Sequence, residues 1–406
     1  MDLLCSDAIG YLDADEIVER ANQKAGVPDP RPDRFRGNLD MLVNAVNDEA
    51  KLSVAGAKVC TDIHVNAYRN RIQVDYWTGQ YPEMADEAIK DPIFLVGLPR
   101  SGTTYFQYLF DQDPSVRMLR TWEGKQPCPP PGLDPASVDR RREEMATAAH
   151  GLAVVPFTNE EDARKYKAMH LTDLDGPQEC VGIMDQTFGN IGVLWRHEAP
   201  RFMDHLLDDI DLDECYRYHR QLLQLLQFGT APRTWALKWP CHLLALDSLK
   251  LTYPDSRLIC THRDPVRALA SNCSLGYLLR KGTSDNVDPH AVGRDIHRLT
   301  SIFIQNQLAF DDRTAGTPQA LIHVDYYRLV NEPEAAMVEV FDKLDREFTP
   351  EARRGVSNWR AENPQGKRGR HEYVLEDFGL DPDEIAEEYA EYTTRFGVRS
   401  EDSPID

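Results

Sequence analysis

The residues whose types and spacing favour anion chemistry begin at Gly97, where the chain reads Gly-Leu-Pro-Arg-Ser-Gly-Thr-Thr. An apolar run precedes this stretch and helix-period residues follow it, which predicts a loop between a strand and a helix. The first-turn amides of a helix have no intrahelical partners, and the aligned peptide dipoles place partial positive charge there. We therefore expect a phosphate or sulfate group at this loop, where Gly97 and Gly102 let it approach the backbone.

The spacing from Gly97 to Gly102 copies the nucleotide-binding P-loop, GxxxxGK[ST]. Here, however, Thr103 stands at the lysine position and the cation is Arg100. In nucleoside triphosphatases the lysine and a magnesium ion neutralise the β and γ phosphates. A loop that lacks this lysine is expected to serve a transferable group of lower charge.

A second candidate anion site follows the strand predicted at residues 257–261. Asp264 is a good N-cap and Pro265 a good first helical residue, and Arg263 lies just before them. Ser271 comes about two helical turns later, roughly 10 Å along the axis. One phosphate therefore contacts both Arg263 and Ser271 only if the arginine reaches back along the helix.

The tripeptide His262-Arg263-Asp264 also occurs in protein-kinase catalytic loops. Those loops bind metal through an asparagine five residues after the aspartate, a position that Leu269 occupies here. The sequence therefore excludes a protein-kinase catalytic loop.

Candidate catalytic groups lie near two other elements. Lys238 and His242 come at the carboxyl end of a short predicted strand that Pro240 ends, and ligands bind at this edge of parallel sheets. Trp122 and Glu123, which follow the first anion-binding helix, offer an aromatic face and a carboxylate base. Both Glu123 and His242 are candidates for the base, and we favour Glu123 because its loop is expected to line the acceptor side.

Basic residues gather once more at residues 363–371, in a loop bracketed by glycines on an otherwise acidic chain. Alone, such a loop is typical of a solvated turn. After two anion motifs, we interpret it as a phosphate clamp made by Lys367, Arg368 and Arg370.

A pattern of strand and then helix occurs four times and predicts an α/β fold, with a P-loop-like parallel sheet flanked by helices. Residues 91–380 are expected to form this domain, with a helical insertion at about 133–230. Helical spacing predicts a helical segment packed on the core over residues 1–90. Residues 381–406 are expected to form an acidic helix or tail.

The net charge of −21 argues against a general nucleic-acid or anionic-membrane surface. The N-terminus lacks the pattern of a secretory signal, and no apolar run is long enough for a membrane span, so that we expect a cytoplasmic protein. The eight cysteines form no CxxC pair and are expected to be reduced core residues.

The stretches PRSGTT, LKWPCHL and THRDPVRALAS and the late basic loop together resemble the sulfotransferases that use 3′-phosphoadenosine 5′-phosphosulfate, above all a bacterial branch with extended helical segments. The tyrosylprotein and cytosolic branches are more distantly similar. The resemblance implies a 5′-phosphosulfate site at Arg100, Ser101, Gly102, Thr103 and Thr104. It also implies a 3′-phosphate site at Arg263 and Ser271, and a role for Lys238 in bridging the donor and the leaving oxygen.

The resulting hypothesis is in-line transfer of a sulfuryl group from this donor to a hydroxyl of a small-molecule, lipid or glycan acceptor, without a metal. One alternative is a P-loop phosphotransferase that uses ATP and magnesium, which the missing loop lysine disfavours. A second alternative is a nucleotide-binding module without catalytic activity. The sequence leaves the acceptor and the oligomeric state open.

Overall fold

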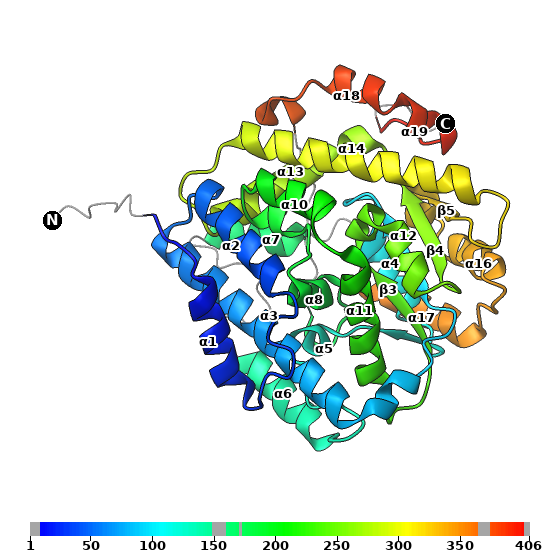
Figure 1. Cartoon of the computed structure of the whole chain (residues 1–406). Coiled ribbons are helices and arrows are strands. Elements are labelled where there is room, and N and C mark those ends of the chain that lie inside the picture. Colours follow the sequence, from blue (N-terminus) through cyan, green and yellow to red (C-terminus); the bar gives the residue numbers. More distant parts are fainter. Residues whose placement is uncertain (1–8, 148–159, 170–172, 364–373, 402–406) are drawn as a thin grey trace.

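In the part of the chain that the structure describes, the strands of the sheet pair in parallel (Figure 1). The computed structural model describes residues 9–147, 160–169, 173–363 and 374–401. Within these ranges five strands pair in the order β2-β3-β1-β4-β5, which confirms the predicted parallel α/β fold. The strands are β1 (Ile93–Gly97), β2 (Val116–Met118), β3 (Thr234–Lys238), β4 (Arg257–His262) and β5 (Ile322–Asp325).

Helices precede, interrupt and follow the sheet in the described chain. Before β1 come α1 (Ala14–Ala25), α2 (Arg36–Glu49), α3 (Val54–Gln80) and η1 (Pro82–Asp86). Between β1 and β3 lie α4 (Thr103–Phe110), α5 (Thr121–Lys125), α6 (Ala136–Thr147), α7 (Glu160–Met169), α8 (Val181–Met184), η2 (Asp185–Thr187), α9 (Val193–Arg196), α10 (Pro200–Asp208) and α11 (Leu212–Gln227). After β3 come η3 (Pro240–Leu244), α12 (Leu246–Thr252), α13 (Pro265–Lys281), α14 (Pro289–Thr314), α15 (Tyr326–Asn331), α16 (Pro333–Lys343), α17 (Pro350–Glu362), η4 (Leu375–Phe378), α18 (Pro382–Glu388) and α19 (Ala390–Arg395).

The edge strand β2 is the strand that the sequence pattern did not predict. It has only three residues, and its middle residue is Arg117, so that it shows no apolar run. It becomes a strand by pairing with β3, where Val116 lies opposite Thr234. A segment this short is recognised only once its partner is in place.

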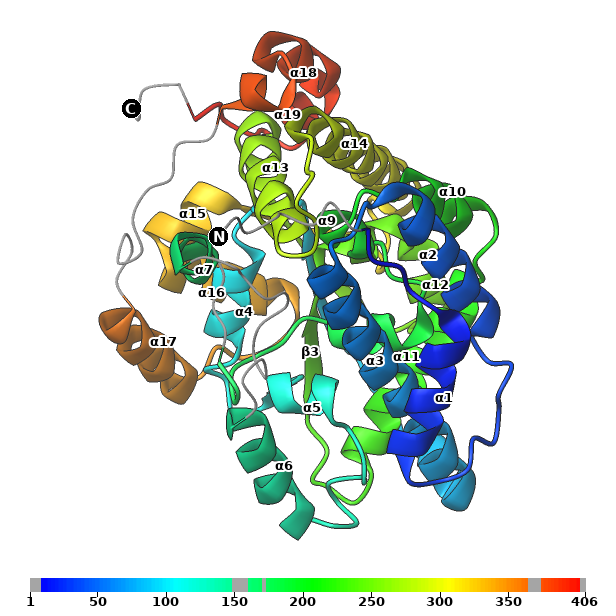
Figure 2. The same cartoon turned by 90° about the vertical axis from the view of Figure 1, so that its left-hand side faces the viewer.

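Side chains of β1 point alternately to the two faces of the sheet. Phe94 and Val96 belong to the larger of two buried hydrophobic clusters among the described residues, whereas Ile93 and Leu95 belong to the smaller one. The smaller cluster includes residues of α4 and α16, and the larger includes residues of α3 and α11. Figure 2 shows β3 between these two groups of helices, with α4 and α16 on one side and α3 and α11 on the other.

The N-terminal helices contribute residues to the larger cluster. Arg34, between α1 and α2, joins them to α11 through a bond of 2.8 Å from its Nη2 to Glu214. Arg34 also pairs with the buried Asp75 of α3. The division of the chain at residues 90 and 380 stays a prediction.

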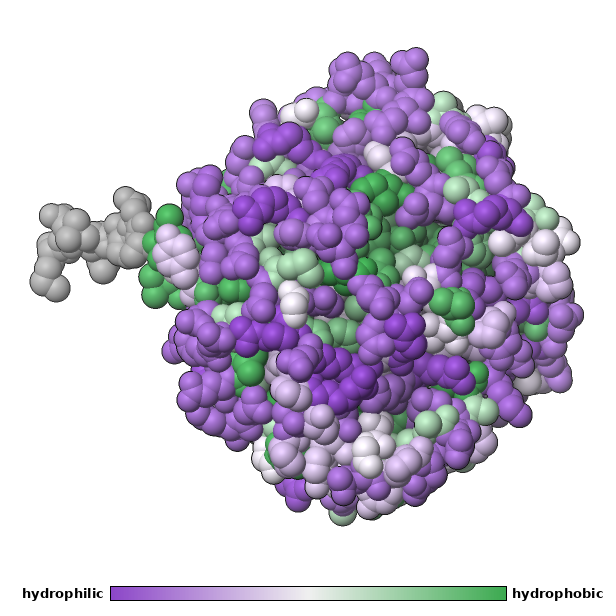
Figure 3. Space-filling model, viewed as in Figure 1, coloured by the Kyte–Doolittle hydropathy of each residue, from purple (hydrophilic) through white to green (hydrophobic). Residues whose placement is uncertain are grey.

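The surface is mostly polar, as the acidic composition implies, and Figure 3 shows hydrophilic residues over most of one face. Among the described helices, none is both long and apolar enough to span a membrane. The seven cysteines in the described ranges are free and buried, which confirms for these residues the expectation of reduced core thiols.

Candidate functional site

The loop between β1 and α4 adopts a backbone conformation that its glycines allow. Gly97 has a φ of 134° and Gly102 a φ of 85°, both in the region that favours glycine. A Cβ at Gly97 would lie 2.5 Å from Oγ1 of Thr261, so that the close approach of β4 requires a residue without a side chain. Arg100 has a φ of 71°, a conformation that costs a non-glycine residue about 1–3 kcal/mol and that clusters at functional sites.

Ser101 joins this loop to β4. Its side chain is fully buried, and its hydroxyl donates a hydrogen bond of 2.7 Å to the carbonyl of Leu98. It also shares one of 2.7 Å with the hydroxyl of Thr261. The side chain of Ser101 therefore fixes the shape of the loop, which leads into the first-turn amides of α4, groups that have no intrahelical partners.

The two anion motifs meet at Arg100, although they are far apart in the sequence. Nε of Arg100 donates a hydrogen bond of 3.0 Å to the hydroxyl of Ser271 on α13. Nη1 of Arg263 donates one of 2.7 Å to the backbone carbonyl of Arg100. Pairing of β1 with β4, in which Gly97 lies opposite Thr261, brings the two loops to one edge of the sheet. The structure thus places Arg100, Arg263 and Ser271 together.

Arg263 has a carboxylate partner that the sequence motifs did not reveal. Its Nε donates a hydrogen bond of 2.6 Å to Glu401, which lies 138 residues further along the chain. Its guanidinium also lies 4.6 Å from the centre of the Tyr326 ring. Burial opposes the charge of Arg263, but the bond to Glu401 and the nearby Tyr326 and Tyr327 together outweigh burial and hold the pKa of the guanidinium above its ordinary value. An anion at Arg263 therefore meets a fully charged arginine.

Lys238 forms the polar centre at the end of β3. Its side chain is 1% exposed, and its Nζ donates a hydrogen bond of 3.0 Å to the hydroxyl of Thr104 on α4. The same ammonium pairs with the carboxylate of Glu179, in the loop before α8. The Glu179 side chain is 19% exposed, so that its carboxylate links the buried ammonium to solvent. The structure thus brings Lys238 to the loop that was predicted to hold the transferred group.

Glu123 has both carboxylate oxygens engaged. Oε1 accepts a hydrogen bond of 2.8 Å from Arg117, and Oε2 accepts one of 2.8 Å from the backbone of Arg120, which caps α5. The Arg117 guanidinium in turn lies 4.2 Å from the ring centre of Trp235. Glu123 therefore holds α5 against β2, and the structure does not bring it to Lys238.

His242 lies on the opposite face of the sheet from the ammonium of Lys238. Its ring is fully buried, contacts Phe94 at 5.1 Å between ring centres, and shares a hydrogen bond of 2.7 Å with Tyr216. Burial lowers the pKa of His242 well below its ordinary value, and the nearby His219 lowers it further. His242 is thus neutral, and the structure does not place it beside Thr104.

Two further observations concern the predicted sites. Lys367, Arg368 and Arg370 lie outside the described residues, so that the phosphate clamp stays a prediction. A cavity of about 460 Å³ lies beside β5 and is lined by residues that include Tyr327 and Arg399. Its lining includes neither Arg100 nor Lys238, and it is separate from the polar centre at the end of β3.

Sequence reasoning missed Glu179 and Glu401, because neither lies in a recognisable motif. Glu179 is 59 residues from Lys238, in a loop that reads Gly-Pro-Gln-Glu and carries only a turn signal. Glu401 follows the last described helix in an acidic tail, where no local pattern distinguishes it from the other carboxylates. Both residues are recognised as partners only through the folded chain.

The sequence of the chain was compared with family profiles and with curated protein sequences. Residues 92–350 match the sequence profile of the sulfotransferase family. A search of curated protein sequences returned no significant match.

Solved structures match over almost the whole chain. The sulfotransferase STF9 from Mycobacterium avium is 28% identical, with a TM-score of 0.84, and the match covers 98% of this chain and 100% of that one. STF1 from Mycobacterium tuberculosis is 27% identical, with a TM-score of 0.79 and a coverage of 95% and 100%. These matches extend beyond the family profile and include most of the N-terminal helical segment.

Proposed function

This chain belongs to the sulfotransferase family and is an enzyme that transfers sulfuryl groups, and we propose that its donor is 3′-phosphoadenosine 5′-phosphosulfate. The acceptor that we propose is a hydroxyl of a small molecule, a lipid or a glycan. The observation that carries the proposal is the position of Lys238, which joins Thr104 of the anion loop to the carboxylate of Glu179.

The donor would be held at both of its charged ends. The 5′-phosphosulfate fits the first-turn amides of α4 together with Thr103, Thr104 and Arg100. The 3′-phosphate fits Arg263 and Ser271, which the structure holds next to Arg100. Glu401 would leave Arg263 when the phosphate arrives, because both carry negative charge and need the same guanidinium.

The residues at the end of β3 suit an in-line displacement. The acceptor oxygen forms a bond to sulfur, and the bond between sulfur and the 5′-phosphate oxygen breaks. Lys238 would stabilise the negative charge that develops on the leaving phosphate oxygen, in a buried site where such stabilisation is strong. Thr104 orients the ammonium toward the loop.

We propose Glu179 as the base that accepts the proton of the acceptor hydroxyl. Its carboxylate is partly exposed beside Lys238, whereas Glu123 is committed to Arg117 and Arg120 and His242 is buried on the other face. A base must lie within hydrogen-bond reach of the proton that it accepts. Of these three groups, Glu179 is the one that pairs with Lys238, whose ammonium also contacts Thr104, and this position supports the assignment.

Single-turnover kinetics with saturating donor test this assignment. Glu179→Gln is expected to lower the rate by about 10²–10⁴-fold, while donor affinity is retained. Because Glu179 also pairs with Lys238, the pH profile is needed as well, and the acidic limb of the rate profile should disappear in the variant.

Glu123→Gln and His242→Gln serve as matched controls and should keep most of the wild-type rate per folded molecule. A full loss in either control, with Glu179→Gln near wild type, would assign the base to that residue instead. A titration with adenosine 3′,5′-bisphosphate and with ATP tests the donor separately. Tighter binding of ATP, with transfer that requires magnesium, would favour a phosphotransferase.

A further inference from the structure

Three side chains with metal-binding atoms converge in the core behind β3. Cys180 precedes α8, His219 lies on α11 and His242 lies on η3. One potential ligand atom of each lies within 4.8 Å of the other two, and all three side chains are fully buried. Residues from three separate elements thus meet at one point.

Both histidines are oriented by tyrosines through one ring nitrogen. Nδ1 of His219 shares a hydrogen bond of 2.7 Å with the hydroxyl of Tyr253, and Nδ1 of His242 shares one of 2.7 Å with Tyr216. Within the described chain, Nε2 of each histidine is buried and has no hydrogen-bond partner. Histidines that bind metals show this arrangement, with one ring nitrogen held by a neighbour and the other directed at the ion.

Buried histidines outside the cluster differ in this respect: His197 has a partner for its second nitrogen, whereas His64 has no described partner for Nε2. His197 is also fully surrounded, and its Nε2 lies 3.7 Å from the sulfur of Cys60, which is hydrogen-bonding distance for a thiol. A buried donor or acceptor without a partner costs about 1–3 kcal/mol. Two such nitrogens in one cluster, next to a thiol, are therefore costly unless something binds them.

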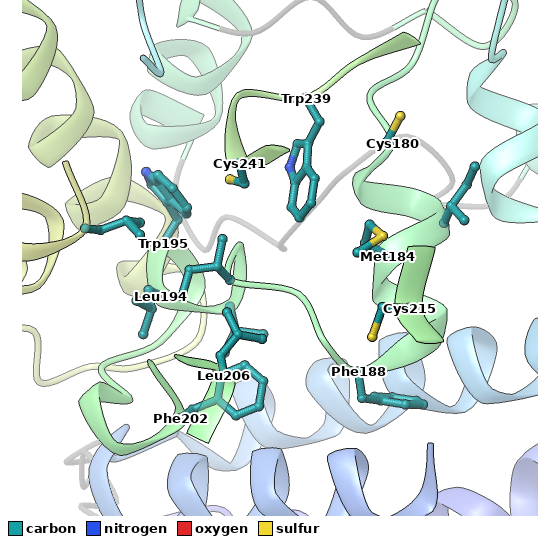
Figure 4. Close-up of a cluster of buried hydrophobic side chains, with 14 of the residues drawn as sticks. Cys180, Met184, Phe188, Leu194, Trp195, Phe202, Leu206, Cys215, Trp239 and Cys241 are labelled. Atoms are coloured by element: carbon teal, nitrogen blue, oxygen red, sulfur yellow. The ribbon is translucent and has the colours of Figure 1, made fainter. Parts of the chain in front are cut away.

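We propose that Cys180, His219 and His242 bind one thiophilic transition-metal ion, Zn²⁺ or Cu⁺. A thiolate sulfur and two imidazole nitrogens are ligands that both ions prefer. On binding, the Cys180 thiol loses its proton to solvent and the sulfur forms a bond to the ion, while both imidazoles bind through Nε2 as neutral donors. In Figure 4, Cys180 lies at the start of α8, with Met184 further along the helix and Trp239 nearby.

The site is a structural one, behind the catalytic edge and not on it. The backbone amide of Cys180 donates a hydrogen bond of 2.9 Å to the carbonyl of Lys238, and Glu179 is the neighbouring residue. An ion that joins α8, α11 and η3 would therefore lie beside the backbone that carries the Lys238–Glu179 pair and would stabilise the fold there. The ion takes no part in sulfuryl transfer.

Metal content of the purified chain tests the proposal. Protein produced with added zinc or added copper is measured by mass spectrometry for ions per chain, and we expect about one Zn²⁺ or Cu⁺. Loading with Co²⁺ provides a second readout, because a cobalt–thiolate bond adds a charge-transfer absorption band in the near ultraviolet.

The matched variants are His219→Gln and His64→Gln. His64 on α3 is also a buried histidine whose Nε2 has no described partner, but it lies outside the cluster. His219→Gln should weaken metal binding by about 10–100-fold or more, and His64→Gln should keep the full metal content.

Absence of stoichiometric metal from the wild type under both loading conditions would overturn the proposal, as would equal metal content in the two variants. If His219→Gln does not fold, Cys180→Ser replaces it, and the cobalt–thiolate band must then disappear. None of these readouts depends on sulfuryl transfer, so that the metal site and the proposed function can fail separately.

Discussion

The two faces of the sheet differ sharply at the end of β3, although the same short segment supplies both. On the face of the sheet that α4 covers, the Lys238 ammonium contacts Thr104 and Glu179. These three polar side chains reach the surface through the partly exposed Glu179. On the other face, His242 lies in a closed core with Phe94 and His219. The difference teaches that position at a strand end is not enough to predict a catalytic role, because the face decides what a side chain contacts.

The alternation of side chains explains this difference. Ala236 belongs to the smaller hydrophobic cluster, and Lys238, two residues on, points to the same face. Trp235 and Leu237 belong to the larger cluster on the other face. Pro240 then starts η3, which turns the chain so that the His242 ring packs against Phe94 of the larger cluster.

The largest effect is expected from Lys238→Met, which removes the charge but keeps most of the side-chain volume. The rate of sulfuryl transfer should fall by about 10²–10³-fold, because the leaving oxygen loses its charge stabilisation. Single-turnover kinetics measures this loss.

The control for this experiment lies on the closed face. Tyr253→Phe removes only the hydroxyl that holds His219, and it should lower the free energy of unfolding by about 1 kcal/mol with little change in rate. Equal losses of rate in the two variants would contradict the functional difference between the faces.

Acid should lower the free energy of unfolding, because the helical side of the core contains buried histidines such as His64. Burial lowers the pKa of His64 to about 4, and the nearby charge of Arg196 adds to this effect. As the pH falls from about 6.5 toward 4, the unfolded state takes up a proton that the folded state does not, and stability is lost.

The size of this loss is about 3 kcal/mol, from roughly 1.4 kcal/mol for each unit of pKa difference. Urea unfolding between pH 7 and pH 4 measures it. His64→Gln should reduce the slope of the profile over this window, to which other buried histidines such as His219 and His242 also contribute, and an unchanged slope would show that His64 takes no part in the acid dependence.

Arg263→Ala tests the proposed 3′-phosphate site at the carboxyl ends of the strands. A charge-assisted contact with phosphate contributes about 1.5–3 kcal/mol, so that affinity for adenosine 3′,5′-bisphosphate should fall by roughly tenfold or more. Calorimetric titration measures this change. Unchanged affinity in the folded variant would place the 3′-phosphate elsewhere.

The smallest effect is expected from Glu401→Gln. Burial opposes the charge of Glu401, but in the absence of nucleotide Arg263, Tyr327 and Arg267 together lower the pKa of Glu401, so that its carboxylate is charged and competes for the guanidinium. Removing this charge should tighten nucleotide binding by about threefold, equivalent to roughly 0.6 kcal/mol. Weaker binding in this variant would show that Glu401 supports the nucleotide site.

Much of the fold and part of the candidate site could be predicted from local patterns. The Gly-rich loop, the Asp264 cap and the strand before each of them depend on residues that are close in the sequence, and the structure contains all of them. β2 was missed because three residues carry too little pattern. The sequence predicts Glu123 or His242 as the base because each lies near a motif; the structure shows that Glu123 caps a helix and His242 is buried, and the identity of the base stays a prediction.

The sequence by itself determined the features that depend on neighbouring residues, such as the anion loop and the start of the helix after it. A loop that turns into a helix exposes amides whatever the rest of the chain does, and an arginine next to it adds charge. Only the tertiary structure decided which carboxylates meet those cations, because Glu179 and Glu401 come from 59 and 138 residues away. Contacts at such distances depend on how every intervening helix packs, and no local spacing encodes them.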